Sequence, residues 1–419
     1  MISRFSCKNY KNINVDSLEL KRVNLLVGPN NSGKSNFISA INYLADMLRV
    51  GKENGFRSSF INYIKENNWS HIMNKGLGKL SPIEFAWFMH AGDRDVEYKI
   101  QFVAGDKVED CDILWEEINI TGSDSDKESK ENCGFRFHEK TVGKGVFFAT
   151  DEKDSKQEWM VNASSKDSVL ARYEEILLNS TGLLTNNHTK IKLPALFESV
   201  KKHLMTYRHY KSSGFDLSGI REPYSTQSID DYLHTNAVNF AGVFNLYKAK
   251  DIIWRDSFNE RMRELIHDLK TEDVVSEYNK LFFKMVYDGG QFDLSDVSEG
   301  TLKGLVLNLL LHAPQGVRTG LLALDEPEMN LHPAWQKVVG NWILHANGVD
   351  QCIISTHSPD LLDVFTESFL QGDVAVFVFD NYGSHIRKLD GDSMKDELDG
   401  WTLGDLYRTS DPAIGGWPW

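Results

Sequence analysis

The run from Gly28 to Ser35 constrains the fold of this chain more than any other part of its sequence. It reads GPNNSGKS and fits G-x-x-x-x-G-K-[ST] at every fixed position. The continuous apolar run Val23 to Val27 precedes it and predicts a buried strand, and Phe37 to Leu48 after it has helical spacing. A loop between a strand and a helix is the context that this motif requires. The sequence therefore predicts a phosphate-binding loop.

The residue types in this loop suit a nucleotide with its magnesium ion. Glycines permit a tight turn whose N–H groups point at phosphate oxygens. Lys34 supplies a cation for the β and γ phosphates, and the Ser35 hydroxyl is a ligand for Mg²⁺. We therefore predict ATP and Mg²⁺ as cofactors. The residues predicted to bind the nucleotide here are Gly28, Pro29, Asn30, Asn31, Ser32, Gly33, Lys34, Ser35 and Asn36.

A second apolar run, Leu321 to Leu324, ends in two acids, as expected of a Walker B element. Asp325 is predicted to hold Mg²⁺ through water, and Glu326 to polarise the attacking water as general base. Acids at the end of a strand also cap helices, so this signal gains its specificity from the phosphate loop. Together the two elements predict hydrolysis of ATP, with Lys34 and Glu326 as catalytic residues.

The order of the predicted elements indicates an α/β core interrupted by other structure. Extended runs and the phosphate loop open the chain, and segments from Ile83 to Ile120 resemble strands of an antiparallel sheet. Helical periodicity runs from Ser168 to Met285, including VSEYNKLFFKMVY, without a sustained heptad register. From Leu302 onward helices alternate with apolar strands, which is typical of a parallel sheet. These strands are predicted at Gly320 to Leu324, Cys352 to Ser355 and Val374 to Phe379. The predicted domains are an N-terminal lobe at 1–165, a helical insert at 166–290 and a C-terminal lobe at 291–419.

Two short runs in the last third of the chain resemble a known family. LDEPEMNLHP at Leu324 to Pro333 and STHSP at Ser355 to Pro359 look like segments of the ABC-type ATPases related to SMC, RecF and OLD proteins. The resemblance implies that His357 is a switch histidine that senses the γ-phosphate, and that Asn330 to His332 touch an opposing head. It also implies the fold class: an α/β, ABC/SMC-like ATPase head with a mixed sheet and a parallel core that carries the P-loop, interrupted by a β-rich region and a compact helical insert.

The run Ser298 to Thr301, SEGT, resembles the ABC signature element in the form used by this branch. Ser298 and Gly300 are predicted to bind the γ-phosphate held by the other subunit, since a serine hydroxyl and a glycine N–H at a helix N-terminus form an anion site. The alternative is an ordinary serine N-cap. If the signature reading holds, the ATP sites are composite and the protein is a homodimer or a higher homo-oligomer.

The remaining candidates are weaker. Ser35 and Asp325 lie 290 residues apart, which requires an insert like that of the smaller OLD-like ATPases. Gln101 is a candidate for a second Mg²⁺ contact, and Arg4 or Lys11 for contacts to adenine. The segment VKKHLMTYRHYK at Val200 to Lys211 interleaves basic and aromatic residues, which favours either nucleic-acid contact or a solvated basic helix face.

Composition limits the classes of partner and the compartment. A formal net charge of −14 argues against coating nucleic acid through overall charge, although DNA stays possible. The four cysteines are far apart and suggest neither a disulfide framework nor a zinc site. No apolar run is long enough for a membrane segment, so we expect a cytoplasmic protein with no membrane partner. That expectation, with the unusual signature, disfavours the energy subunit of a membrane transporter.

The resemblance also implies a function. OLD-type proteins commonly carry a Toprim nuclease after the ATPase, but only 62 residues follow His357, so we expect no nuclease in this chain. The segments Leu403 to Tyr407 and Gly415 to Trp419 resemble tails of stand-alone ATPases that are often encoded beside an effector in bacterial anti-phage systems. The leading hypothesis is a dimeric, ATP-driven switch that controls such an effector. The alternative is a RecF-like DNA repair ATPase that clamps DNA itself.

Overall fold

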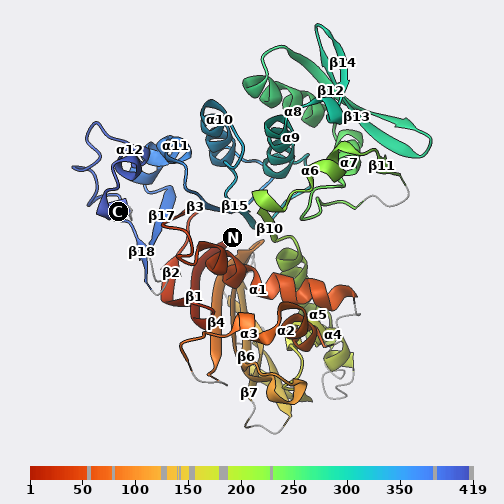
Figure 1. Cartoon of the computed structure of the whole chain (residues 1–419). Helices are drawn as coiled ribbons and strands as arrows, with labels where there is room; N and C mark the ends of the chain where they lie inside the picture. The colour runs from red at the N-terminus through yellow and green to blue at the C-terminus, as the bar shows by residue number, and fades with distance from the viewer. Residues whose placement is uncertain are drawn as a thin grey trace. The chain divides into compact units, whose positions relative to one another are not determined.

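The structure is a computed structural model of the chain, and its contacts divide the chain into two compact units (Figure 1). Unit 1 comprises residues 1–21, 30–207 and 380–386, and unit 2 comprises residues 22–29, 208–379 and 387–419. The structure describes residues 1–53, 58–77, 81–123, 130–138, 140, 143–150, 156–178, 187–226, 230–380 and 385–414. Residues 124–129 and 151–155, in charged runs that the sequence predicts as solvated hairpin tips, and the C-terminal Gly415 to Trp419 lie outside the described residues.

Unit 1 is built on an eight-stranded antiparallel sheet in the order β2-β1-β4-β5-β6-β7-β8-β9. In β4, Ile83, Phe85 and Trp87 are buried while the residues between them are partly exposed. This period of two is typical of a sheet with one covered face. The strands are β1 (Ile2–Tyr10), β2 (Ile13–Glu19), β4 (Ile83–Ala91), β5 (Arg94–Val103), β6 (Asp112–Ser123), β7 (Lys130–His138), β8 (Lys144–Thr150) and β9 (Lys156–Asn162).

Helix α1 (Lys34–Glu53) covers the buried face of this sheet. The Tyr43 ring stacks on Phe85 and Phe102 with centroids 4.8 and 5.3 Å apart. Trp87 Nε1 donates a hydrogen bond of 3.0 Å to the Ile41 carbonyl and so ties the sheet to the helix. The other helices of unit 1 are α2 (Ser59–Asn67), α3 (Trp69–Ile72), α4 (Val169–Leu178) and α5 (Asn187–Met205).

Unit 2 contains a six-stranded sheet in the order β10-β15-β16-β3-β17-β18. The first five strands pair in parallel, and all residues of β3, β15, β16 and β17 are buried. Strands covered on both faces read as unbroken apolar runs, which explains why three of them were predicted with their observed limits. The strands are β3 (Val23–Val27), β10 (Arg208–Lys211), β15 (Leu322–Asp325), β16 (Cys352–Ser355), β17 (Val374–Phe379) and β18 (Ile386–Lys388).

Among the helices of unit 2, two follow the parallel strands β15 and β16, and others pack on neighbouring helices or on a small antiparallel sheet (Figure 1). They are α6 (Leu217–Arg221), α7 (Phe240–Lys250), α8 (Ile252–Leu265), α9 (Glu299–Leu311), α10 (Pro333–Leu344), α11 (Pro359–Leu370) and α12 (Leu403–Arg408). The predicted α/β class, with a parallel core and a separate antiparallel region, is confirmed. Among the described residues, no helix has both the length and the apolarity needed to cross a membrane.

The helical prediction for VSEYNKLFFKMVY is wrong. Residues 275–287 form most of a hairpin in a small antiparallel sheet, in which Leu281, Phe283 and Met285 are buried at every second position. The turn residues Tyr278 and Asn279 both have positive φ, as a tight hairpin turn requires. The strands of this sheet are β11 (Tyr224–Ser225), β12 (Leu269–Glu277), β13 (Lys280–Tyr287) and β14 (Gly290–Asp293). The predicted segment 166–290 is thus partly strand, and it is divided between the two units.

The basic segment Val200 to Lys211 is not one helix. Helix α5 ends at Met205, and Arg208 begins the edge strand β10 of the parallel sheet. Tyr207 and Tyr210 are 1% and 2% exposed, so neither ring is available to stack on a base. The segment therefore loses the feature that favoured nucleic-acid contact.

Candidate functional site

The phosphate loop begins in unit 2, where β3 ends at Val27. Gly28 has φ of +148°, and a Cβ built on it would lie 2.4 Å from the Phe379 carbonyl oxygen. Both the backbone conformation and the close approach of β17 require glycine here. The chain passes from unit 2 to unit 1 between Pro29 and Asn30, both of which were predicted to bind the nucleotide.

The rest of the loop lies in unit 1 and leads directly into α1. Asn31 and Gly33 have φ of +63° and +105°, so the backbone turns sharply before the helix. The Phe37 N–H donates a 2.8 Å hydrogen bond to the Gly33 carbonyl, which makes the loop continuous with the first helical turn. Ser32 and Lys34 are 0% and 6% exposed. Such a turn at the N-terminus of a 20-residue helix suits a phosphate group, because backbone N–H groups and the helix dipole favour an anion there.

A pocket of about 500 Å³ adjoins the loop within unit 1. Asn36 Nδ2 donates a 2.7 Å hydrogen bond to Asn12 Oδ1, and the Asn12 side chain also lies against Gly33. Apart from Met73, the lining side chains are polar or basic, which suits a ribose or base; they are Lys11, Asn12, Asn36, His71, Asn74 and Lys75. Lys11, one of the residues predicted to contact adenine, therefore lies in a suitable place.

The other residue predicted to contact adenine, Arg4, lies over the Phe88 ring, 3.9 Å from its centroid. Gln101 is in the middle of β5, where its amide donates a 2.7 Å hydrogen bond to Glu84 Oε1 across the sheet. These contacts explain both side chains structurally. Their roles toward the nucleotide stay predictions.

The predicted Walker B acids lie at the end of β15 in unit 2. Asp325 is 9% exposed and accepts a hydrogen bond from the Ser355 hydroxyl on the neighbouring strand β16. The Glu326 N–H donates to the Ser355 carbonyl at 3.0 Å. Glu326 has φ of +53°, a left-handed conformation that costs energy for any residue with a Cβ. Non-glycine residues in such conformations cluster at functional sites.

His357 lies two residues after β16 and is held next to these acids. Its Nε2 is 3.8 Å from Glu326 Oε1, and its Nδ1 is 3.1 Å from the Tyr407 hydroxyl oxygen. Its backbone N–H donates a 2.8 Å hydrogen bond to Glu328 Oε1, which also accepts from Thr356 Oγ1 at 2.8 Å. The structure therefore brings the predicted base and the predicted switch histidine together.

Glu328, the third acid of the DEPE run, was not assigned a role from the sequence. Burial raises the pKa of its carboxyl, although hydrogen bonds from the His357 backbone and from Thr356 lower it, and the nearby Glu326 charge raises it further. The one sequence signal that could have pointed to Glu328 was that it is an acidic residue inside the DEPE motif. Tyr407 belongs to the segment Leu403 to Tyr407, which was compared only with the tails of related ATPases. Nothing local in the sequence connects it to His357, which is 50 residues away.

Ser298, the predicted signature serine, is the N-cap of α9 and its hydroxyl accepts a 3.1 Å hydrogen bond from the Thr301 N–H. The structure confirms the N-cap contact, and the signature role stays a prediction. The helix is joined to the loop that follows Glu326: Lys303 Nζ donates to the Met329 carbonyl at 2.9 Å, and Asn330 Nδ2 donates to Glu299 Oε2 at 3.1 Å. A Cβ built on Gly300 would lie 3.2 Å from the Asn330 carbonyl oxygen.

The residues present fit ATP with Mg²⁺ on structural grounds. Gly28 and Gly33 shape a loop that an added Cβ would obstruct, Lys34 is a cation in it, and Asp325 is an oxygen donor held in place by Ser355. Mg²⁺ binds through one or two protein oxygens together with substrate phosphates, and Ser35 and Asp325 offer oxygens of that kind. Across the described ranges, no group of three or more His, Cys, Asp or Glu side chains is arranged as a metal site.

Comparison with known proteins identifies the family. The family model described as "AAA domain, putative AbiEii toxin, Type IV TA system" matches residues 23–363, which include the phosphate loop, the Walker B acids, the predicted signature and His357. No curated protein matches. Two solved structures are similar: an SMC head bound to the C-winged helix domain of ScpA, at 14% identity over 94% of this chain and 99% of that chain with a TM-score of 0.44, and the SMC head domain from Thermotoga maritima, at 12% identity over 93% and 99% with a TM-score of 0.38. Because the family model spans most of the sequence, the chain belongs to this AAA domain family and is a nucleotide-binding P-loop ATPase.

Proposed function

We propose that this ATPase is a nucleotide-driven switch in which two copies pair, close on two ATP molecules and reopen after hydrolysis. Closing and opening would hold or release an effector protein encoded nearby, in bacterial anti-phage defence. The family description, which names a toxin and a type IV toxin–antitoxin system, agrees with such a setting.

Each site residue has a chemical role in this proposal. Glu326 accepts a proton from the attacking water, and Asp325 holds Mg²⁺ through water. Lys34 neutralises charge on the β and γ phosphates. His357, beside Glu326, senses whether the γ-phosphate is present. Mg²⁺, when bound, stabilises the charge that develops on the transferred phosphoryl group.

The observation that carries the switch is the connection between the catalytic loop and α9. The strained Glu326 begins a loop whose residues Met329 and Asn330 bind Lys303 and Glu299 of that helix. Ser298, Glu299 and Asn330 are all exposed. A movement at the catalytic carboxylate therefore has a direct route to an exposed helix N-terminus, where an anion such as the γ-phosphate of a second copy would be stabilised.

The first test is the mass of the Glu326→Gln protein in solution, with and without Mg-ATP, alone and mixed with the products of neighbouring genes. Removal of the base should trap the closed state, so the mass should rise from 47.7 kDa toward that of a dimer, with an effector bound. Lys34→Ala is the control, because it should bind no nucleotide and show no shift. A Glu326→Gln protein that stays monomeric with Mg-ATP would contradict the switch.

A second test asks whether the ATP sites are shared between copies. Lys34→Ala and Ser298→Arg should each be inactive alone, whereas an equal mixture should regain about a quarter of wild-type hydrolysis. That fraction follows because about half of the dimers are heterodimers with one intact site of two. Ser295→Arg, at an exposed position just before α9, is the matched control and should stay active. A mixture no more active than its components would exclude composite sites.

Binding of DNA by the protein alone would favour the repair alternative. The burial of Tyr207 and Tyr210 removes its main local support. ATP-dependent DNA binding that weakens with salt, with no effector bound, would nevertheless replace the switch by a DNA clamp.

A further inference from the structure

Helix α12 near the C-terminus is held firmly against α11. Thr402 caps its N-terminus by accepting a 3.0 Å hydrogen bond from the Asp405 N–H. Arg408 at its last turn donates a 2.9 Å hydrogen bond to Asp363 on α11. A Cβ built on Gly404 would lie 2.1 Å from Asp363 Oδ1, so the two helices approach as closely as a glycine permits. Helix α12 is therefore packed tightly against α11.

This docking brings Tyr407 of α12 to His357, which lies just before the first turn of α11. The Tyr407 hydroxyl oxygen is 3.1 Å from His357 Nδ1. The backbone N–H of His357 is bound to Glu328 Oε1. The histidine is thus anchored at two points, its main chain by Glu328 and its ring by Tyr407.

The Glu326 carboxylate and the Tyr407 hydroxyl both favour the same tautomer of the His357 imidazole. Nε2 faces Glu326 Oε1 at 3.8 Å, and a carboxylate favours an N–H on the nitrogen that faces it. Nδ1 is then the acceptor, and the Tyr407 hydroxyl donates to it. Burial, and secondarily the charge of Glu328, raise the pKa of Tyr407, so the phenol keeps the proton that it donates.

We propose that Tyr407 is a positioning residue that holds the His357 imidazole in the Nε2–H tautomer, with Nε2 turned toward Glu326 and the γ-phosphate. The inference rests on the proposed roles of Glu326 and His357. It makes the C-terminal helix a component of the nucleotide-sensing site, because α12 supplies the hydroxyl that sets the orientation of the ring.

Tyr407→Phe tests this, since it removes the hydroxyl and keeps the ring. We expect kcat for ATP hydrolysis to fall about three- to tenfold, the range for one hydrogen bond that acts in the transition state, while the Kd for ATP changes less than about twofold. Tyr287→Phe in β13 is the matched control, because the Tyr287 hydroxyl donates a weak hydrogen bond of 3.9 Å to Met285 Sδ. This variant should leave kcat unchanged. An unchanged kcat in Tyr407→Phe would overturn the proposal.

A double-mutant cycle separates positioning from a general structural effect. In a His357→Ala background, Tyr407→Phe should cause no further loss of activity, because there is no ring left to position. An equal loss in both backgrounds would mean that Tyr407 acts independently of His357.

The tautomer itself is measured without relying on hydrolysis. In ¹⁵N-histidine-labelled wild-type protein, with the signals assigned by comparison with His357→Gln, Nε2 should be protonated and Nδ1 unprotonated. Tyr407→Phe should show both tautomers. A protonated Nδ1 in the wild type would overturn the inference, whereas normal hydrolysis by Glu326→Gln would overturn the proposed function and leave this tautomer result standing.

Discussion

In unit 1 the carboxylate of Glu116 is surrounded by donors, whereas in unit 2 the carboxylate of Glu326 is partly exposed beside one imidazole. Glu116, 1% exposed, accepts hydrogen bonds from Tyr98 Oη and Ser168 Oγ at 2.7 and 2.8 Å. It also accepts from the N–H groups of Val169 and Leu170 at 2.9 and 3.3 Å. Burial raises its pKa and these hydrogen bonds lower it. The carboxylate thus fixes the start of α4 against the sheet.

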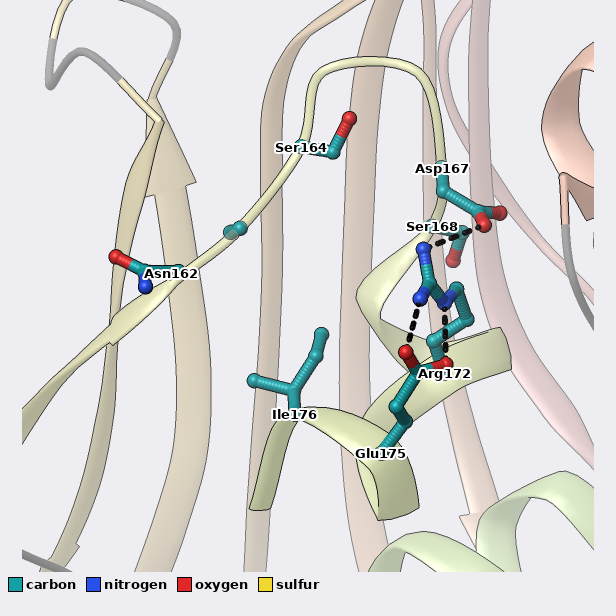
Figure 2. Close-up of a pocket in the computed structure, with 8 residues that line it drawn as sticks. Asn162, Ser164, Asp167, Ser168, Arg172, Glu175 and Ile176 are labelled. Carbon is teal, nitrogen blue, oxygen red and sulfur yellow. Dashed lines mark hydrogen bonds and ion pairs between the residues drawn. The ribbon is translucent and has the colours of Figure 1, made fainter. Parts of the chain in front are cut away.

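The Asp167 carboxylate, in the same region, also has a hydrogen-bond donor at each oxygen. It accepts from the N–H groups of Ser58 and Ser59 at 2.8 and 3.1 Å. Figure 2 shows Arg172 bridging Asp167 and Glu175 at the edge of a pocket of about 460 Å³. Because the charges around this pocket already pair with one another, we assign it no ligand. Glu116 and Asp167, whose carboxylates are occupied by hydrogen bonds and ion pairs, therefore have structural roles.

Glu326 is built in the opposite way. Its backbone is strained at φ of +53°, its side chain is 36% exposed, and its Oε1 lies 3.8 Å from His357 Nε2. A carboxylate that keeps contact with water can take a proton from a water molecule, and one enclosed by donors cannot. The two carboxylates therefore differ both in their hydrogen-bond donors and in their contact with water, and contact with water is what the proposed role of Glu326 as a base requires.

The largest effect that tests this comparison is on catalysis. Glu326→Gln should lower kcat about 10²- to 10⁴-fold, because the general base is lost, and should change the free energy of unfolding by less than about 0.5 kcal/mol. Phosphate release and urea unfolding measure the two quantities. Wild-type hydrolysis would show that another group is the base.

The next effect is on stability. Glu116→Ala should lower the free energy of unfolding by about 3–5 kcal/mol, because buried donors are left without an acceptor. Urea unfolding measures it, and Glu117→Ala, at the adjacent and only partly buried position of β6, is the control. A loss no greater than that of the control would mean that the network around Glu116 is dispensable.

The smallest effect concerns a third acid, Glu272 in β12. It is fully buried, and within the described part of the chain neither carboxylate oxygen has a hydrogen-bond partner on another residue. Burial raises its pKa well above 4.5, only partly offset by the Arg263 charge. The native state therefore binds a proton that the unfolded state releases, so this residue's contribution to stability is lost as pH rises.

Glu272→Gln removes that dependence. Between pH 5 and 6 the free energy of unfolding of the variant, relative to wild type, should rise by about 1.4 kcal/mol. Urea unfolding at both pH values measures it, with Glu277→Gln at the exposed end of the same strand as the control. A difference that does not change with pH would show that Glu272 ionises normally in the folded protein.

Prediction from the sequence succeeded where a pattern is local and failed where it is ambiguous. The strands Val23–Val27, Cys352–Ser355 and Val374–Phe379 were predicted with their observed limits, because buried parallel strands are unbroken apolar runs. The hairpin of β12 and β13 was predicted as helix, because short apolar segments do not distinguish the two periodicities. The edge strand β10, with four residues, is too short to give any period.

For the candidate site, the sequence by itself determined which functional groups are present, and the tertiary structure decided which side chains contact them. GPNNSGKS and LDEP are contiguous runs, so the phosphate loop and the acids could be identified from spacing and context, and His357 was identified from the resemblance of LDEPEMNLHP and STHSP to a known family. That Tyr407 meets His357, and that donors surround Glu116 while none from another described residue reaches the Glu272 carboxylate, depends on contacts between residues far apart in the chain. Such contacts follow from how helices and strands pack, and no local pattern of residues encodes them.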